Sequence, residues 1–174
     1  MSRRTWSWPA LALLAPLGCA AAPPAPPASP ALAPAMRSLA FYVGEWDCQG
    51  TIYDGGKPQP PLPYHVSVHP ILDGSWLEVK FYQGDELIAS ELKGYDESAR
   101  RYRHIGGTGG GASFSSSADG WQGDHMVFHD DHPLPGEHQR TVFTHLSDTR
   151  YSHRAEADTG AGFEPDFEKT CEKR

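Results

Sequence analysis

Short segments in which hydrophobic and polar residues alternate run through the chain from Trp46 onward. A period of two residues is typical of a β-strand that buries one face. Turn-forming combinations of Asp, Gly and Ser separate these segments at roughly ten-residue spacing. The pattern predicts strands near residues 46–53, 63–69, 75–82, 87–95, 101–106, 111–117, 121–129, 139–147, 149–157 and 164–173.

The same pattern predicts an all-β fold. No segment shows a sustained helical period, and only Met36–Tyr42 is expected to form a short helical turn. Because no helix is available to cover the hydrophobic face of such a sheet, we expect the sheet to close on itself, which also removes its edges. The prediction is an up-and-down barrel of about ten antiparallel strands, closed between the first and last strands.

Alternation also predicts which side chains point into the barrel. In residues 87–95 and 139–147 the alternation is ambiguous, so it assigns no inward face there. Elsewhere eight of the inward residues are expected to line a ligand site. They are Tyr64, Phe81, Tyr102, His104, Met126, Phe128, Tyr151 and His153.

Two cysteines of the predicted barrel, Cys48 and Cys171, provide a test of its closure. Cys48 lies near the start of the first predicted strand, and Cys171 lies near the end of the last. When an even number of sequential antiparallel strands closes, these positions lie side by side, as a disulfide across the seam requires. Two separate buried thiols are the alternative, although a disulfide is the usual outcome in an oxidising compartment.

With the two cysteines opposite each other, the register of the whole seam follows. The remaining inward pairs are Trp46–Lys173, Gly50–Lys169 and Ile52–Phe167. The first pair places a cation beside an aromatic ring, and the third is a hydrophobic cross-strand pair. Lys169 is the one residue that this register does not explain, because it points inward.

The chain begins with a predicted signal peptide. Residues 1–19 combine two arginines with a short apolar run that is too short to span a bilayer. Leu17-Gly18-Cys19 resembles the end of a bacterial lipobox, which implies a lipid on Cys19, a place in the periplasm or outer membrane, and membrane contact through that lipid only. Cleavage near Ala20–Ala22 without lipid, which leaves the protein free in the periplasm, is the alternative.

The segment after the predicted signal peptide differs in composition from the barrel. Residues 20–36 are rich in Ala and Pro, so they are expected to form an extended tether, followed by the barrel domain over residues 37–174. The formal net charge is −7 at pH 7, and the sequence contains no basic stripe of Lys and Arg. These features argue against nucleic acid as a partner.

Other motifs give no indication of catalysis. Gly106–Gly111 lacks the Lys-Ser/Thr of a phosphate loop, so it is expected to form a hairpin or a portal. Ser113–Ser117 lacks the Gly-x-Ser-x-Gly elbow of hydrolases. Asp124–His132 is rich in His and Asp, but its spacing matches no specific metal signature, and a polar outer face is the simpler interpretation. We assign no catalytic residue and no metal, and we expect a binding protein rather than an enzyme.

Gly44-x-Trp46 at the start of the first strand resembles the calycins, which include the lipocalins and the fatty-acid-binding proteins. The resemblance implies that Trp46 plugs the closed end of the barrel under a cation, Lys173 or Arg174. The overall likeness is to an uncharacterised bacterial family of calycin-like proteins. Its shared motifs are Val43-Gly44-Glu45-Trp46, Leu72-Asp73-Gly74-Ser75-Trp76 and Gly94-Tyr95-Asp96.

Three functions are compatible with these expectations. The first is an exported, lipid-anchored protein that holds a small apolar or amphipathic ligand in the barrel and needs no cofactor. The second follows from a more distant resemblance to nitrobindin, which implies haem with His153 as its axial ligand. The third is a structural accessory of an envelope assembly with a packed, ligand-free core.

Overall fold

The all-β prediction is confirmed by a computed structural model, which describes residues 30–133 and 138–174. Two short 3₁₀ helices, η1 (Pro34–Tyr42) and η2 (Leu72–Gly74), accompany the strands. The strands are β1 (Gly44–Asp54), β2 (Lys57–Pro58), β3 (Leu62–Ile71), β4 (Trp76–Gln83), β5 (Glu86–Asp96), β6 (Arg101–Thr108), β7 (Ser113–Ala118), β8 (Trp121–Gln122), β9 (His125–Asp130), β10 (Gln139–Ser147), β11 (Arg150–Asp158) and β12 (Phe163–Lys173).

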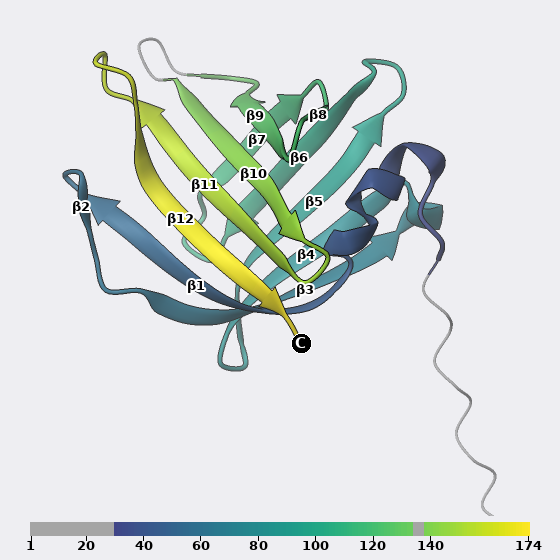
Figure 1. The fold of residues 1–174 in the computed structure, drawn as a ribbon, viewed down its shortest axis with the longest axis horizontal. Coiled ribbons are helices and arrows are strands. Elements are labelled where there is room, and N and C mark those ends of the chain that lie inside the picture. The colour runs from purple at the N-terminus through teal and green to yellow at the C-terminus, as the bar shows by residue number, and fades with distance from the viewer. Residues whose placement is uncertain (1–29, 134–137) are drawn as a thin grey trace, which may run out of the picture.

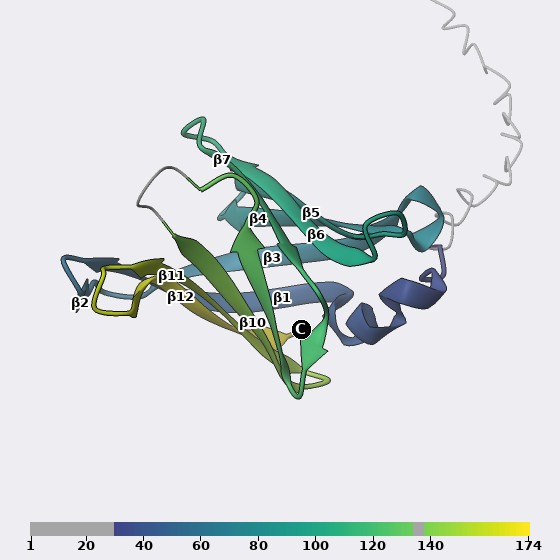
Figure 2. The same ribbon diagram turned by 90° about the horizontal axis from the view of Figure 1, so that it is seen from above.

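Antiparallel pairing closes the sheet into a barrel (Figures 1 and 2). Each barrel strand pairs with the next barrel strand along the chain, and β12 returns to pair with β1. The short strands β2 and β8 pair only with β1 and β9, so they lie outside this circuit. The predicted closure between the first and last strands is therefore confirmed.

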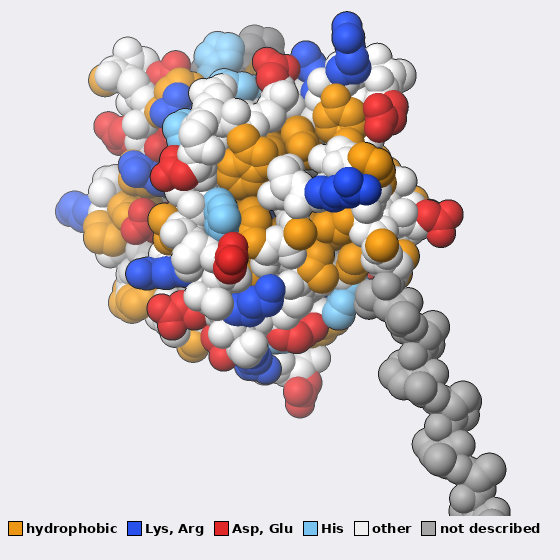
Figure 3. Space-filling model, turned by 45° about the vertical axis from the view of Figure 1, so that its right-hand side comes forward, with side chains coloured by type: hydrophobic (Ala, Val, Ile, Leu, Met, Phe, Trp, Pro, Cys, Tyr) orange, Lys and Arg blue, Asp and Glu red, His pale blue; other side chains and the backbone are white. Residues whose placement is uncertain are grey.

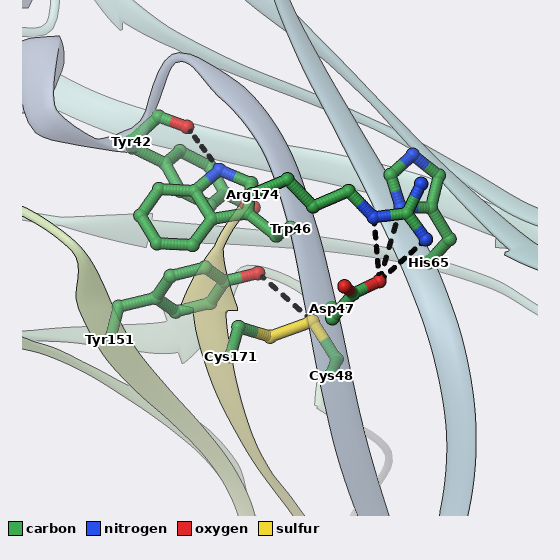
Figure 4. Close-up of a disulfide and its surroundings, with 8 residues drawn as sticks. All are labelled: Tyr42, Trp46, Asp47, Cys48, His65, Tyr151, Cys171 and Arg174. Carbon is green, nitrogen blue, oxygen red and sulfur yellow. Dashed lines mark hydrogen bonds and ion pairs between the residues drawn. A yellow bond between two sulfur atoms is a disulfide. The ribbon is translucent and has the colours of Figure 1, made fainter.

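The predicted register of the seam is also confirmed. Cys48 lies opposite Cys171, and the two form a disulfide with a Cα–Cα distance of 4.1 Å (Figure 4). The other inward pairs are those that the sequence predicts: Trp46–Lys173, Gly50–Lys169 and Ile52–Phe167. The disulfide joins the two ends of the domain, which are 123 residues apart in sequence.

Helix η1 covers one end of the barrel, beside an aromatic cluster. Trp46 is fully buried and its indole N–H donates to the Tyr42 carbonyl oxygen at 2.9 Å. The Tyr151 ring packs edge-on against Trp46, with ring centroids 4.8 Å apart (Figure 4). Lys173 Nζ lies 5.2 Å from the Trp46 ring centroid and donates to the Phe41 carbonyl oxygen. This end is therefore filled by side chains, and we call it the closed end.

The structure differs from the predicted elements at several positions, including helix η2, which the sequence pattern does not predict. Residues 121–129 form two strands rather than one, because the chain turns at Gly123, where φ is +69°. β2 was not predicted, since a strand of two residues has no alternation to detect. Residues 34–36 belong to η1 rather than to a tether, and Met36 is fully buried. The rest of the tether up to residue 29 and the signal peptide, including Cys19, lie outside the described residues.

The outer surface carries hydrophobic side chains next to the point where the described chain begins (Figure 3). Outward-facing Leu92 and Ile105 are direct cross-strand partners on β5 and β6, and each is more than a third exposed.

Among the residues that the structure describes, no helix has both the length and the apolar character needed to cross a membrane.

Candidate functional site

A cavity of about 410 Å³ occupies the half of the barrel away from the closed end. Hydrophobic side chains form much of its wall, from strands on all sides of the barrel. They include Ile52, Phe81, Ile88, Phe114, Phe128 and Phe167. Ile52 and Leu62 line the cavity and are about half exposed, which places its mouth at the end of β1 and the start of β3. The interior of the barrel is therefore not filled.

A buried polar cluster lies at the inner end of this cavity. It consists of Glu91, Lys93, His104, His153 and Lys169, none of which is more than 8% exposed. All but Lys93 line the cavity. Lys93 lies behind them, with its Nζ 5.6 Å from the centroid of the Tyr42 ring at the closed end. The cluster therefore separates the cavity from the aromatic closed end.

Strands β5 and β6 position one half of the cluster. Lys93 and His104 are direct cross-strand partners, so both side chains point into the barrel from the same level. Glu91 is two residues before Lys93 and shares its face. Leu92 lies between them and points outward, which inverts the usual pattern of hydrophobic residues inside. Charged residues thus occupy inward positions of β5.

Glu91 and Lys93 form a buried ion pair. Lys93 Nζ donates to Glu91 Oε2 at 2.8 Å, and His104 Nε2 lies 2.9 Å from that oxygen and 3.0 Å from the Lys93 nitrogen. Burial alone would raise the pKa of the Glu91 carboxyl, but Lys93 and His104 bring that pKa well below its usual value. Burial, with Lys93, lowers the pKa of His104 to about 4. At neutral pH Glu91 is ionised and His104 is neutral.

Strands β11 and β12 position the other half of the cluster, because His153 and Lys169 are also cross-strand partners. Lys169 Nζ lies 4.2 Å from the centroid of the Phe81 ring. No described carboxylate lies within 4 Å of this nitrogen. Burial lowers the pKa of Lys169 to about 7, an effect that Glu91 opposes and Lys93 reinforces. Lys169 is thus a buried amine without a counter-ion among the described residues.

Several buried polar atoms around the cavity have no hydrogen-bond partner among the described residues. They are the Tyr64 hydroxyl, Nδ1 of His104 and both ring nitrogens of His153. Burial, followed by the charge of Lys169, lowers the pKa of His153 well below its usual value, so its ring is neutral at pH 7. Buried polar groups in proteins are almost always hydrogen-bonded. A polar group of a ligand would therefore form its most favourable hydrogen bonds with these unpaired donors and acceptors around the cavity.

The structure brings five of the eight predicted ligand-site residues to the cavity. Tyr64, Phe81, His104, Phe128 and His153 line it.

The other three, Tyr102, Met126 and Tyr151, point inward but do not line the cavity. Tyr151 packs on Trp46 at the closed end, and Met126 is fully buried. The Tyr102 hydroxyl donates to the Ala35 carbonyl oxygen of η1 at 2.9 Å. The physical reason is that alternation tells which face a side chain occupies, but not its height along the barrel.

Sequence reasoning missed Glu91 and Lys93, because charged residues on a strand are expected to face solvent. The ambiguous alternation of residues 87–95 is the one sequence feature that indicates an unusual inner face on this strand. The seam register predicts that Lys169 points inward, but it assigns no role to that position. The neighbours of Lys169, which include His153 and Phe81, come from other strands, so only the tertiary structure identifies them.

The described residues contain no group of three or more His, Cys, Asp or Glu side chains that could hold a metal ion. The fit of His153 as a haem ligand is also poor. An axial histidine is normally oriented by a hydrogen bond from its second ring nitrogen, whereas neither ring nitrogen of His153 has a partner within the described ranges. No observation on this site therefore favours haem.

Comparison with solved structures identifies a similar fold. The crystal structure of Rv2717c from M. tuberculosis matches with a TM-score of 0.58 and 14% sequence identity, covering 83% of this chain and 99% of that chain. At this identity the likeness shows the barrel fold alone. Comparisons with family models and with curated proteins find no match. The resemblance to a calycin-like lipoprotein family thus remains a prediction from motifs.

Proposed function

We propose that this protein binds a small amphipathic molecule in its barrel cavity. The apolar part of the ligand contacts the aromatic and aliphatic wall, and its polar end reaches the buried polar cluster. The observation that carries this proposal is a set of buried polar atoms that have no hydrogen-bond partner among the described residues and that surround a mostly hydrophobic cavity.

The dimensions of the cavity support this proposal. Pockets for small molecules typically measure about 300–1,000 Å³, with apolar walls and a few placed polar groups. The cavity of about 410 Å³ lies at the small end of this range. Transfer of an apolar chain from water to such a wall is favourable, at roughly 25 cal/mol per Å² of buried apolar surface. We therefore expect a ligand with a short hydrocarbon part.

Native mass spectrometry of gently purified protein tests the proposal, together with titration by an apolar fluorescent dye. Ala89 lines the cavity, so Ala89→Trp should fill it and weaken dye binding at least tenfold. Ala99 is exposed in the turn between β5 and β6, so Ala99→Trp is the matched control and should bind normally. Unchanged binding by Ala89→Trp would place the dye elsewhere and contradict a cavity site.

We also propose that the protein is exported and carries lipid on Cys19. The signal-like residues 1–19 support this location, as does the disulfide, because such bonds persist mainly in oxidising compartments. Metabolic labelling with a radioactive fatty acid tests it: wild-type protein should be labelled and recovered with membranes, and Cys19→Ala should be neither. Equal labelling of both proteins would refute lipidation at Cys19.

A further inference from the structure

We propose that the polar end of the bound molecule is a carboxylate, and that Lys169 is its counter-ion. This inference rests on the proposed function and deepens it, because it assigns a charge to the ligand. It depends on the balance of charges at the inner end of the cavity and on the donors that face it.

The charges facing Lys169 leave one positive charge unpaired. Titratable groups reach the cluster from four other strands: Tyr64 on β3, Glu91 and Lys93 on β5, His104 on β6, and His153 on β11. Glu91 is already engaged by Lys93 at 2.8 Å, and these two charges balance. Both imidazoles have lowered pKa values and are neutral. Protonated Lys169 is therefore the net charge of the cluster.

A buried ammonium without an anion is unfavourable, because the desolvation of a charge is compensated only by a close partner. Across the described part of the chain, Lys169 has an aromatic face at 4.2 Å but no carboxylate within 4 Å. Near the mouth, Arg140 shares Glu156 with Arg154, but the Arg140 side chain is 32% exposed, so water screens its charge as it cannot screen that of buried Lys169. Lys169 is therefore the group in the cavity with which an anionic ligand would form the most favourable ion pair.

The groups near Lys169 match a carboxylate better than other polar groups. A carboxylate accepts several hydrogen bonds, and the Tyr64 hydroxyl and an N–H of His153 are donors without partners among the described residues. Charge-assisted bonds of this kind are stronger than neutral ones. A cationic ligand would be repelled by Lys169 and Lys93. A dianionic phosphate would leave excess negative charge beside Glu91, whereas a single carboxylate neutralises Lys169.

Titration calorimetry with two probes of equal chain length tests the inference. Octanoate and 1-octanol have hydrocarbon chains of equal length, but only octanoate can form an ion pair with Lys169. We expect wild-type protein to bind octanoate at least tenfold more tightly than octanol. Lys169→Met should abolish this preference, so that the variant binds octanoate no more tightly than octanol. Lys80→Met, a replacement on an outward position of β4, is the control and should behave as wild type.

Proton uptake provides a readout that does not depend on a variant. A bound carboxylate raises the pKa of Lys169 from its lowered value, so octanoate binding at pH 8 should take up protons from the buffer. Octanol should cause no uptake, and Lys169→Arg should bind octanoate without uptake because arginine stays protonated. Comparison of binding enthalpies in buffers with different ionisation enthalpies measures this quantity.

The possible outcomes separate the two proposals. Equal affinity for octanoate and octanol, with no effect of Lys169→Met, would overturn the carboxylate assignment and leave a neutral-ligand cavity. Failure of both probes and of the dye to bind would overturn the proposed function and this inference with it. Tenfold preference lost in Lys169→Met, with proton uptake in the wild type, would support the inference.

Discussion

Lys169 lies directly opposite Gly50 across the seam between β12 and β1, only two residues from the disulfide at Cys171. A Cβ at position 50 would lie 2.8 Å from the Tyr64 ring and 3.0 Å from the Phe167 ring. The absence of a side chain at Gly50 therefore leaves room for the two aromatic rings that line the cavity beside Lys169. The seam that closes the barrel thus also positions the buried amine.

Replacement of Lys169 should stabilise the protein in the absence of ligand. Burial lowers its pKa in the folded state from 10.5 to about 7, so the unfolded chain binds more protons between these pH values. The wild type should therefore gain stability as pH rises from 7 to 10.5. Lys169→Met should remove this dependence and add on the order of 5 kcal/mol to the unfolding free energy below pH 7.

Urea denaturation at pH 6 and pH 10 measures this effect on Lys169→Met and on the Lys80→Met control. The gain from Lys169→Met should be large at pH 6 and small at pH 10. A Lys169→Met protein that is less stable than the wild type at pH 6 would show that the amine has a stabilising partner.

Removal of the Glu91 charge should destabilise the barrel. Glu91→Gln leaves Lys93 as a buried cation without its anion, a change that typically costs about 3–5 kcal/mol. The lowered pKa of Glu91 means that its contribution is present above pH 4.5 and is lost as pH falls through the folded-state pKa. Chemical denaturation at pH 7 measures the change.

The double variant Glu91→Gln/Lys93→Met is the control for the Glu91–Lys93 pair, because it removes both charges together. It should recover much of the stability that Glu91→Gln loses, and the coupling follows from a double-mutant cycle. Independent, additive effects of the two substitutions would argue against the ion pair.

Loss of the disulfide should lower stability without changing the fold. The bond closes a loop between positions 123 residues apart, and removal of such a bond typically costs about 2–5 kcal/mol. The seam should survive, because backbone pairing between β1 and β12 extends from Trp46 to Ile52. Thermal unfolding of Cys48→Ala/Cys171→Ala should occur at lower temperature and should not respond to reductant, unlike that of the wild type. An identical reductant response in both proteins would be inconsistent with this disulfide.

Gly94 should not tolerate a side chain. A Cβ at this position would lie 2.2 Å from the Trp76 ring, its direct cross-strand partner. Gly94→Ala should therefore displace the indole and reduce the unfolding free energy by about 1–3 kcal/mol. Gly109→Ala is the control, because the nearest atom to its Cβ is 3.6 Å away. Equal denaturation midpoints for the two variants would refute this packing constraint.

The architecture of this protein could be predicted from sequence because its determinants are local or periodic. The period-two alternation of Leu77, Val79 and Phe81 identifies a strand and its inner face without knowledge of any neighbour. Cys48 and Cys171 add one long-range relationship, and a single pair sets the register of an entire antiparallel seam. The inward position of Lys169 follows directly from that register.

The candidate site was decided by the tertiary structure. Alternation could not tell that Tyr151 lies at the closed end while His153, two residues away, lines the cavity. Alternation also does not predict that Glu91 and Lys93 point into the barrel, because charged side chains on a strand are expected to face solvent. The buried Glu91–Lys93 pair is completed by His104 from the neighbouring strand, a contact that exists only after β5 and β6 have paired. The sequence by itself therefore determined the barrel and its seam, and the assembly of ten strands decided which charges meet inside it.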